Sequence, residues 1–261
     1  MYAPIETDIS ERYLERIFRS TDGQTCLVGG WAAYCLVNEN FERANGRSYI
    51  GSRDIDVGFH IDRNWSEEEL RNPDFLKSVR VIEDMGFRAV GFRLLKDFEF
   101  ETGRELSPEE SAKLPLSQIF SLYVDPVVDY IHSKLERSLG FVPIDEPLLS
   151  LVFDKGMCSV AGMFGVEVLL PEPHVLLAMK LNSVVNRDKE HKKIKDIADI
   201  YAPLWFSGMH IAELKADLFR IYSREKARET VRCFAKDEVD KVSAVIGVGS
   251  GEISRVLAEP K

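Results

Sequence analysis

The sequence predicts an α/β protein of the α+β type, with a mixed sheet flanked by helices and followed by a helical C-terminal domain. Short apolar runs at residues 25–28, 51–60 and 120–132 are bounded by glycine or polar turns, which is typical of buried strands. The stretches between them place apolar residues at helical spacing. From Pro171 onward the helical pattern continues to the end of the chain. We therefore predict two domains, residues 1–170 and 171–261.

Bulk composition narrows the class of protein. The chain has 261 residues, of which 45% are hydrophobic, enough to build a substantial core. Its start lacks the basic and apolar regions of a secretory signal, and no apolar run approaches the roughly 18 residues of a membrane span. We therefore expect a soluble, cytoplasmic protein with no membrane partner. The net charge of −9 argues against broad, sequence-independent nucleic-acid binding, although a local basic patch could still dock one RNA end.

The predicted elements begin with a helix. Apolar residues recur at helical spacing over residues 8–20, and Asp8 is the predicted N-cap. After the strand at 25–28, residues 31–37 read as a second helix that is apolar on nearly all sides. The distance to the next strand then requires an excursion within residues 38–50.

The middle of the chain contains clear start and stop signals. Ser66 and Glu69 form a capping box, which predicts a helix start. A second helical piece should run to about Asp84 and end at Gly86. Residues 87–100 alternate loosely between apolar and polar, which indicates one or two strands.

The predictions for the remaining elements rest on less regular sequence patterns. Residues 101–117 are polar with two prolines and predict a loop with a short helix. Pro126 cannot donate to a sheet ladder, so the strand at 120–132 should be at an edge or broken there. Residues 148–170 predict short strands, and the glycines around Gly247 predict a turn between two C-terminal helices.

Two aspartates lie on one face of the predicted strand at 51–60. Because successive side chains of a strand point to opposite faces, Asp54 and Asp56 project from the same side. Two neighbouring carboxylates repel each other unless a cation lies between them, most simply a divalent metal such as Mg²⁺ or Mn²⁺. The strand at 120–132 should supply a third carboxylate: Asp129 is the first candidate because it stands among apolar residues, and Asp125, of the same parity, is the alternative. His60 shares the face of Asp54 and Asp56, and we expect it to be structural.

A glycine pair follows the strand at 25–28. Gly29 and Gly30 let backbone amides approach a ligand closely, and a helix beginning near Trp31 would direct its positive end toward the same point. Ser52 precedes the two aspartates and could contact a phosphate, although a capping or turn role fits equally well. A phosphate-bearing ligand with its metal would fit both halves of this segment.

The glycine turn with its later Asp-Ile-Asp strand resembles the nucleotidyltransferase superfamily that includes DNA polymerase beta. The hallmark of that superfamily is a hydrophobic-Gly-Gly/Ser turn followed by an Asp-x-Asp strand. The segment 171–201 is similar to the AbiEii family of nucleotidyltransferase toxins, in which a Lys-Leu helix is followed by Arg and then a Lys-Asp-x-x-Asp helix. On the matching positions, the resemblance implies that Lys180 serves the nucleotide, that Arg187 assists it and that Asp196 belongs to the last acidic motif.

The resemblance also implies an activity. It implies a metal-dependent transfer of a nucleoside monophosphate from an NTP to a hydroxyl acceptor, with Mg²⁺ or Mn²⁺ held by Asp54, Asp56 and Asp129. The acceptor implied by the toxin family is RNA, for example a tRNA end, and the implied protein partner is an antitoxin. Such an RNA would be docked by the basic residues Arg187, Lys189, Lys192 and Lys193.

Three alternatives stay open at this point. The acceptor could instead be a small molecule, as in enzymes that adenylylate antibiotics, which the acidic net charge slightly favours. The chain could also be a catalytically silent nucleotide-binding or protein-binding module. Within the last motif, Lys192 with Asp196 and Lys195 with Asp199 could simply be i,i+4 ion pairs of a solvated helix.

Overall fold

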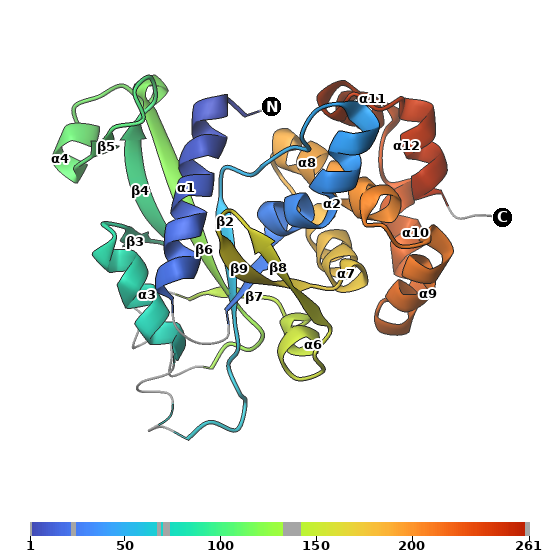
Figure 1. The fold of residues 1–261 in the computed structure, drawn as a ribbon, viewed down its shortest axis with the longest axis horizontal. Helices are drawn as coiled ribbons and strands as arrows, with labels where there is room; N and C mark the ends of the chain where they lie inside the picture. The colour runs from blue at the N-terminus through green and yellow to red at the C-terminus, as the bar shows by residue number, and fades with distance from the viewer. Residues whose placement is uncertain (1, 22–24, 67–68, 70–73, 133–141, 259–261) are drawn as a thin grey trace. The chain divides into compact units, whose positions relative to one another are not determined.

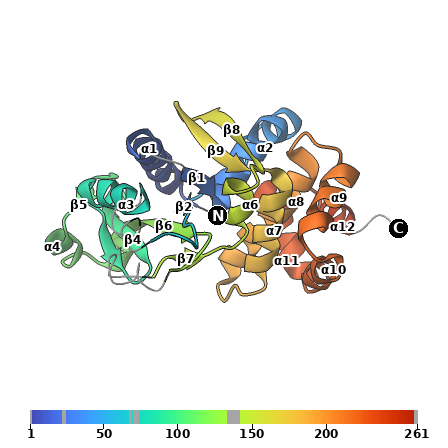
Figure 2. The ribbon, with the colours of Figure 1, turned by 90° about the horizontal axis from the view of Figure 1, so that it is seen from below.

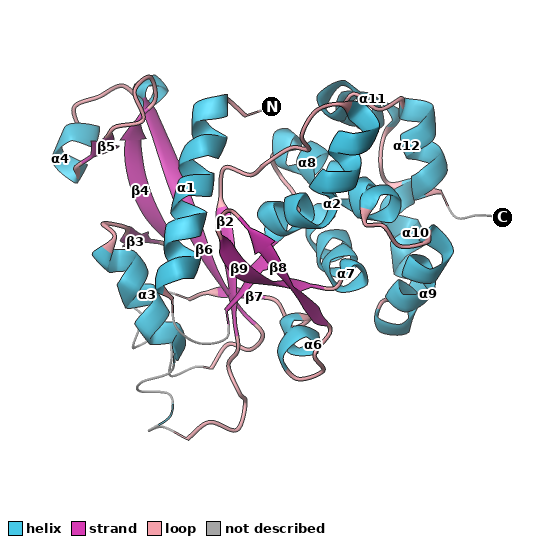
Figure 3. Cartoon of the chain, viewed as in Figure 1, coloured by secondary structure: helices cyan, strands magenta, loops and turns pink. Residues whose placement is uncertain are grey.

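The computed structural model describes residues 2–21, 25–66, 69, 74–132 and 142–258 (Figures 1 and 3). Within this part of the chain there are two compact units. The sheet unit contains residues 2–28 and 52–170, and the helical unit contains residues 29–51 and 171–261. The chain passes between the units after Leu170, where we predicted a boundary, but residues 29–51 group with the C-terminal helices rather than with the sheet.

The sheet is mixed, as predicted. Its strand order is β3-β4-β6-β2-β1-β9-β8, with β5 paired to β4 and β7 paired to β6. The pairs β2–β6 and β1–β9 are parallel, whereas β1–β2 and β4–β6 are antiparallel. The strands are β1 Thr25–Val28, β2 Ile55–Phe59, β3 Arg88–Val90, β4 Arg93–Glu99, β5 Glu105–Leu106, β6 Ile119–Val128, β7 Ile144–Asp145, β8 Cys158–Met163 and β9 Val166–Pro171.

The helices of the sheet unit differ from prediction mainly at their starts. They are α1 Pro4–Ser20, α3 Asp74–Asp84, α4 Pro108–Ser111, the 3-10 helix η2 Leu116–Gln118 and α6 Leu149–Phe153. Helix α1 starts before Asp8 because Pro4 is suited to a first helical position and the Ala3 amide donates to Glu6 Oε2 at 2.9 Å. Helix α3 ends before Gly86, as predicted, where φ is +90°.

Two further expectations for the sheet unit concern the segment after Ser66 and residues 148–170. The Ser66–Glu69 capping contacts are present, with the Glu69 amide donating to Ser66 Oγ at 3.3 Å, but the residues that would continue that helix lie outside the described ones. The predicted strands of 148–170 are correct only for β8 and β9, because Leu149–Phe153 forms helix α6.

One face of the sheet is apolar and is covered by α1 and α3. Tyr13 of α1 meets the Phe98 ring of β4 edge to face at 5.4 Å, and Phe75 of α3 lies 4.8 Å from the Phe59 ring of β2. These rings are almost completely buried. Because these rings lie on the face of β2, β4 and β6 that is covered by the helices, the alternate side chains of these strands lie on the opposite face. That opposite face carries the candidate site.

Pro126 lies in the middle of β6, where we expected an edge or a break. The strand is continuous, and Pro126 is the register partner of Val57 in β2. On the other side of β6, however, pairing with β4 stops at Val124 and pairing with β7 begins at Val127. On that side, Pro126 therefore lies between the part of β6 that pairs with β4 and the part that pairs with β7. At such a position the lack of a backbone N–H costs the least stability.

The helical unit consists of seven described helices that bury a shared apolar core. They are α2 Gly29–Asn45, α7 Pro173–Val184, α8 Glu190–Phe206, α9 Ile211–Ile221, α10 Arg224–Arg232, α11 Lys236–Ile246 and α12 Ser250–Leu257. Helix α8 packs against α2, α7, α11 and α12, and the last two also contact each other (Figure 2). The turn predicted around Gly247 separates α11 from α12, with φ of +66° at that residue.

Helix α2 is longer than the predicted 31–37 and occupies much of the expected excursion. Phe41 continues its buried stripe and meets the Phe206 ring of α8 edge to face at 5.0 Å. The Asn40 side-chain amide also donates to the Phe206 carbonyl at 3.0 Å. None of the described helices has the length and apolar character needed to cross a bilayer.

Candidate functional site

A row of charged side chains crosses the sheet on the face opposite α1 and α3. Asp56 of β2 is the register partner of Val28 in β1 and of Asp125 in β6. The β4–β6 register pairs Leu94 with Val124, so the next position places Arg93 beside Asp125. Paired residues of neighbouring strands present their side chains on the same face. The order across the sheet is therefore Arg93, Asp125, Asp56 and Val28.

Asp54 belongs to the same cluster, although it lies just before β2. It precedes Ile55, the first residue of that strand, and its Oδ2 is 3.5 Å from Nη2 of Arg93, which also binds Asp125. Extending the β2–β6 register by one position places Asp54 beside Tyr123. Asp54, Asp56 and Asp125 thus converge from two adjacent strands.

The guanidinium of Arg93 binds two of these carboxylates. Its Nε donates to Asp125 Oδ1 at 2.7 Å, and its Nη2 donates to Asp125 Oδ2, so the contact is bidentate. The same Nη2 lies 3.5 Å from Asp54 Oδ2. The guanidinium carbon also sits 4.0 Å from the centroid of the Tyr123 ring.

These contacts are largely removed from water. The side chain of Arg93 is 18% exposed, and those of Asp54 and Asp125 are 14% and 7% exposed. Burial alone would lower the pKa of Arg93, but the charges of Asp125, Asp54 and Asp56 outweigh it and raise that pKa above its ordinary value. Arg93 is therefore a fixed positive charge in this cluster. No spacing signal in the sequence points to Arg93, because its contact with Asp125 follows from the position of β4 beside β6.

Asp129, our first candidate for the third carboxylate, does not belong to this cluster. It lies four residues after Asp125, which corresponds to roughly 13 Å along a strand. Its Oδ2 is 2.6 Å from His60 Nδ1, and its Oδ1 accepts the Ile61 amide at 2.7 Å. Asp125, the alternative, takes the position that we predicted for Asp129. The structural role that we expect for His60 stays a prediction.

A helix side chain separates the two polar groups on this face. Between them the sheet has Gly58, where an added Cβ would lie 2.9 Å from Leu149 Cδ2 of α6. Leu149 is fully buried. Glycine at residue 58 therefore makes room for α6 to pack on the sheet, with Asp56 on one side of Leu149 and His60 on the other.

The cluster has suitable ligands for a metal but an unsuitable arrangement. Three carboxylates are the donor set that Mg²⁺ and Mn²⁺ prefer. Among the described residues, however, no group of His, Cys, Asp and Glu side chains is arranged to hold a metal ion. Arg93 instead binds both oxygens of Asp125 and lies 3.5 Å from Asp54. In this arrangement the guanidinium provides the positive charge that the sequence pattern led us to expect from a metal.

The glycine turn follows this row directly in the chain. Gly29 is the residue after Val28, and its φ of +68° lies in the left-handed region that favours glycine. Helix α2 begins at Gly29 rather than near Trp31, so the turn and the helix N-terminus are the same residues. Ser52, the third candidate for phosphate contact, is buried, and its role stays a prediction.

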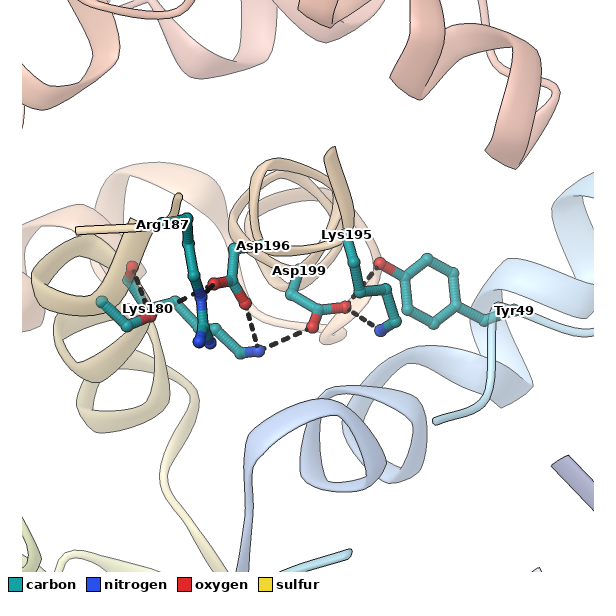
Figure 4. Close-up of polar contacts among 7 residues, drawn as sticks. Tyr49, Lys180, Arg187, Lys195, Asp196 and Asp199 are labelled. Atoms are coloured by element: carbon teal, nitrogen blue, oxygen red, sulfur yellow. Dashed lines mark hydrogen bonds and ion pairs between the residues drawn. The ribbon is translucent and has the colours of Figure 1, made fainter. Parts of the chain in front are cut away.

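The basic and acidic residues of the predicted nucleotide motif form a buried network in the helical unit (Figure 4). Lys180 Nζ of α7 lies 2.8 Å from Asp196 Oδ1 and 2.8 Å from Asp199 Oδ2, both on α8. Arg187 Nε donates to Asp196 Oδ2 at 2.5 Å. Lys195 donates to Asp199, which also accepts the Tyr49 hydroxyl at 3.0 Å. The network therefore ties α7, α8 and the segment after α2 together.

This network shows where the structure places Lys180 and Asp196, for which we predicted roles at the nucleotide. Both side chains are buried, at 6% and 2% residue exposure, and their charged atoms are engaged with each other. Burial alone would lower the pKa of Lys180 and raise that of Asp196, but the opposite charges outweigh it in both cases. Lys180 thus has a raised pKa and Asp196 a lowered pKa, as expected for a stable ion pair. In this arrangement the charge of Lys180 is paired within the helical unit, and its role toward a nucleotide stays a prediction.

The alternative reading of this helix is partly correct. Lys195 and Asp199 do form the predicted i,i+4 pair, but the pair is buried rather than solvated. Burial lowers the pKa of Lys195, and Asp199 offsets the shift only in part. In the predicted RNA-docking patch, Lys193 Nζ lies 2.7 Å from Glu238, so that patch is partly neutralised within the chain.

Two of the cavities lined by described residues are relevant here, and both lie outside the carboxylate cluster. One, of about 220 Å³, is in the sheet unit beside His60, Asp129 and Asp154. The other, of about 420 Å³, is in the helical unit and is lined mainly by apolar residues such as Leu177, Leu218 and Val231. Neither includes Asp54, Asp56 or Asp125.

Comparisons with known proteins give one structural likeness. No family model matches the chain, and no curated protein matches it. Among solved structures, an antigenic nucleotidyltransferase-like protein from Paracoccidioides brasiliensis matches with a TM-score of 0.39 and 14% sequence identity. The match covers 87% of this chain and 91% of that chain. At this TM-score the likeness does not establish a common fold.

Proposed function

We propose that the protein is a metal-dependent nucleotidyltransferase whose acidic site is formed by Asp54, Asp56 and Asp125. The observation that supports this most directly is the β2–β6 register, which pairs Asp56 with Asp125 on the face that also carries Asp54. Carboxylates from adjacent strands on one face are a suitable donor set for hard divalent cations. A bound Mg²⁺ or Mn²⁺ would supply positive charge beside a triphosphate.

The residues of the chain would contribute to the reaction through position and charge. The β2–β6 register holds Asp56 and Asp125 side by side, and a cation would bind them in place of the Arg93 guanidinium. The backbone amides of Gly29 and Gly30, which follow Val28 in the chain, would donate to phosphate oxygens. The product would be an acceptor carrying a nucleoside monophosphate, together with pyrophosphate.

The acceptor hydroxyl is proposed to belong to RNA, as the resemblance to the AbiEii toxins implies. Arg187 is about one-third exposed at its side chain and could contact an RNA phosphate while it remains paired with Asp196. The ion pair between Lys193 and Glu238 and the net charge of −9 favour the alternative, a small-molecule acceptor. Only an RNA acceptor should lose affinity steeply as salt is added, because its binding releases counterions.

A second candidate function is a catalytically silent binding module. It is favoured by one observation, the bidentate contact of Arg93 with Asp125, which satisfies the acidic cluster without a metal. Such a module would bind nucleotide or protein and would release no pyrophosphate.

One experiment separates these functions. The protein is incubated with each labelled NTP, Mg²⁺ or Mn²⁺, and total cellular RNA, beside an Asp54→Ala/Asp56→Ala variant. The proposal predicts labelled acceptor and pyrophosphate with the wild-type protein only. Equal labelling by both proteins would refute the assignment of the site, and pyrophosphate release in the absence of RNA, with a labelled small molecule, would support the alternative acceptor.

A further inference from the structure

The apolar cavity of the helical unit is large enough for a small molecule. Its volume of about 420 Å³ lies within the range of roughly 300–1,000 Å³ that is typical of small-molecule sites. Its floor is formed by side chains of α7 and α8 that are at most 6% exposed, namely Leu177, Leu181, Ile200 and Leu204. The lower part of this cavity therefore suits an apolar group.

The sequence of α10 explains both the space and the opening of this cavity. Ala227 and Val231 are four residues apart, so they share one face of the helix, and both line the cavity. Ala227 is buried, and its single methyl group leaves space that a larger apolar side chain would fill. The residues that follow each of them, Arg228 and Arg232, also line the cavity and are exposed. The cavity thus reaches the surface beside two arginines.

The charged residues that line the cavity are all positive. They are Lys215 of α9 with Arg228 and Arg232 of α10, and the described lining residues include no Asp or Glu. This local excess contrasts with the net charge of −9 of the whole chain. Arg228 also interacts with Glu225 of its own helix, which does not line the cavity. The rim of the cavity therefore favours an anionic group.

Lys215 is held in place at the cavity wall. Its Nζ donates to the carbonyl oxygens of Val256 at 3.2 Å and Ala258 at 3.0 Å, at the C-terminal end of α12. Carbonyl oxygens there carry only partial negative charge. The two arginines add planar guanidinium groups, which can bind both oxygens of one carboxylate. A carboxylate is therefore the anion that this rim suits best.

We propose that this cavity binds a small amphipathic carboxylate, with its apolar body on the floor formed by α7 and α8 and its carboxylate at the rim with Arg228 and Arg232. The affinity comes mainly from releasing water from the apolar walls, and the arginines select the charge of the ligand. A ligand that is polar throughout is disfavoured, because the floor offers no partners for its polar groups. This site is independent of the proposed function, since all of its lining residues belong to the helical unit.

The test is isothermal titration calorimetry of the full chain with hexanoate, octanoate and decanoate, below the concentrations at which they form micelles. Octanol and octylammonium are the matched neutral and cationic probes. The inference predicts that octanoate binds and that affinity rises about fourfold for each added CH₂ group until the cavity is filled. Octylammonium should bind about tenfold or more weakly than octanoate, because it meets cations at the rim.

Three variants locate the site. Arg228→Gln/Arg232→Gln removes two charges and should weaken octanoate binding about tenfold while leaving octanol binding unchanged. Lys226→Gln removes an exposed charge of the same helix outside the cavity, so it is the matched control and should bind octanoate as the wild type does. Val231→Trp fills the cavity and should abolish the binding of both octanoate and octanol.

Several results would overturn this inference. Failure of the wild type to bind octanoate, or undiminished binding by Val231→Trp, would show that the cavity is not the site. Equal binding of octanoate and octylammonium would refute the selection of an anion. If sedimentation shows a dimer that Val231→Trp dissociates, the cavity is covered by a second copy of the chain and the inference is wrong. Urea unfolding checks the fold of each variant, and Ala227→Leu replaces Val231→Trp as the filling variant if the latter does not fold.

Discussion

Replacing Lys180 tests the structural role that the network in Figure 4 gives to this side chain. Lys180→Met keeps the length and apolar stem of the residue and removes its charge. Asp196 and Asp199 would then lose one cation each, at separations of 2.8 Å and 2.8 Å, inside a protein interior where their own exposure is 2% and 0%. Removing one partner of a buried ion pair generally costs about 3–5 kcal/mol.

The structure indicates the lower end of this range for Lys180→Met. Asp196 keeps Arg187, and Asp199 keeps Lys195 and the Tyr49 hydroxyl. We therefore expect a loss of about 3 kcal/mol in the free energy of unfolding. For a protein of this size that corresponds to a melting temperature lower by roughly 6–12 °C.

The assay is urea unfolding followed by far-UV circular dichroism, with hydrogen exchange to locate the effect. Peptides from α7 and α8 should exchange faster in Lys180→Met than in the wild type, because the ion pairs that join the two helices are lost. Lys226→Met, at an exposed position of α10, is the matched control and should change the free energy of unfolding by less than about 0.5 kcal/mol. A change below about 1 kcal/mol for Lys180→Met would refute the structural role and reopen its assignment to a phosphate.

Three further predictions concern packing, hydrogen bonding and pH. Gly58→Ala should lower the free energy of unfolding by about 1–3 kcal/mol because its Cβ would lie 2.9 Å from Leu149 Cδ2. In a double-mutant cycle measured by urea unfolding, Leu149→Ala should relieve part of that loss. Strictly additive effects of the two substitutions would contradict the contact. Tyr49→Phe should cost about 1–3 kcal/mol in the same assay because it removes the buried bond to Asp199, and a neutral result would argue against that bond. Because the pKa of Asp196 is lowered in the folded state, its stabilising contribution is full above roughly pH 5 and is lost as the pH falls through the folded-state pKa. Asp196→Asn should therefore flatten the acidic limb of the stability profile measured between pH 7 and pH 2, and an unchanged limb would contradict the lowered pKa.

The fold could be predicted from the sequence where the information is local. The period of two predicted that Asp54 and Asp56 share one face, and both lie close enough to Arg93 for their charges to raise its pKa, although the strand itself begins only at Ile55. Helix α2 was predicted too short, because the residues after Val37 look polar until Phe41 is seen to pack on Phe206. Local pattern could not show that α2 groups with the C-terminal helices.

The candidate site depends on long-range pairing, which the sequence does not display. Asp125 and Asp129 have the same parity, and only the β2–β6 register decides which of them neighbours Asp56. Arg93 comes from a hairpin about thirty residues earlier and is placed by the β4–β6 register. The role of Lys180 was ambiguous in the sequence. A lysine in an apolar helix can contact a phosphate, extend to solvent or form a buried ion pair. Only the packing of α7 on α8 shows that it forms the buried ion pair.

The central proposal is that Asp54, Asp56 and Asp125 hold a divalent cation when the nucleotide is bound. The most direct test is a crystal structure of the protein with Mn²⁺ and a non-hydrolysable NTP analogue, in which anomalous scattering locates the metal. We predict a manganese peak among the three carboxylates, with Asp125 no longer bound by the Arg93 guanidinium. A bound analogue with Arg93 still bidentate on Asp125 and no anomalous peak among these side chains would contradict the claim.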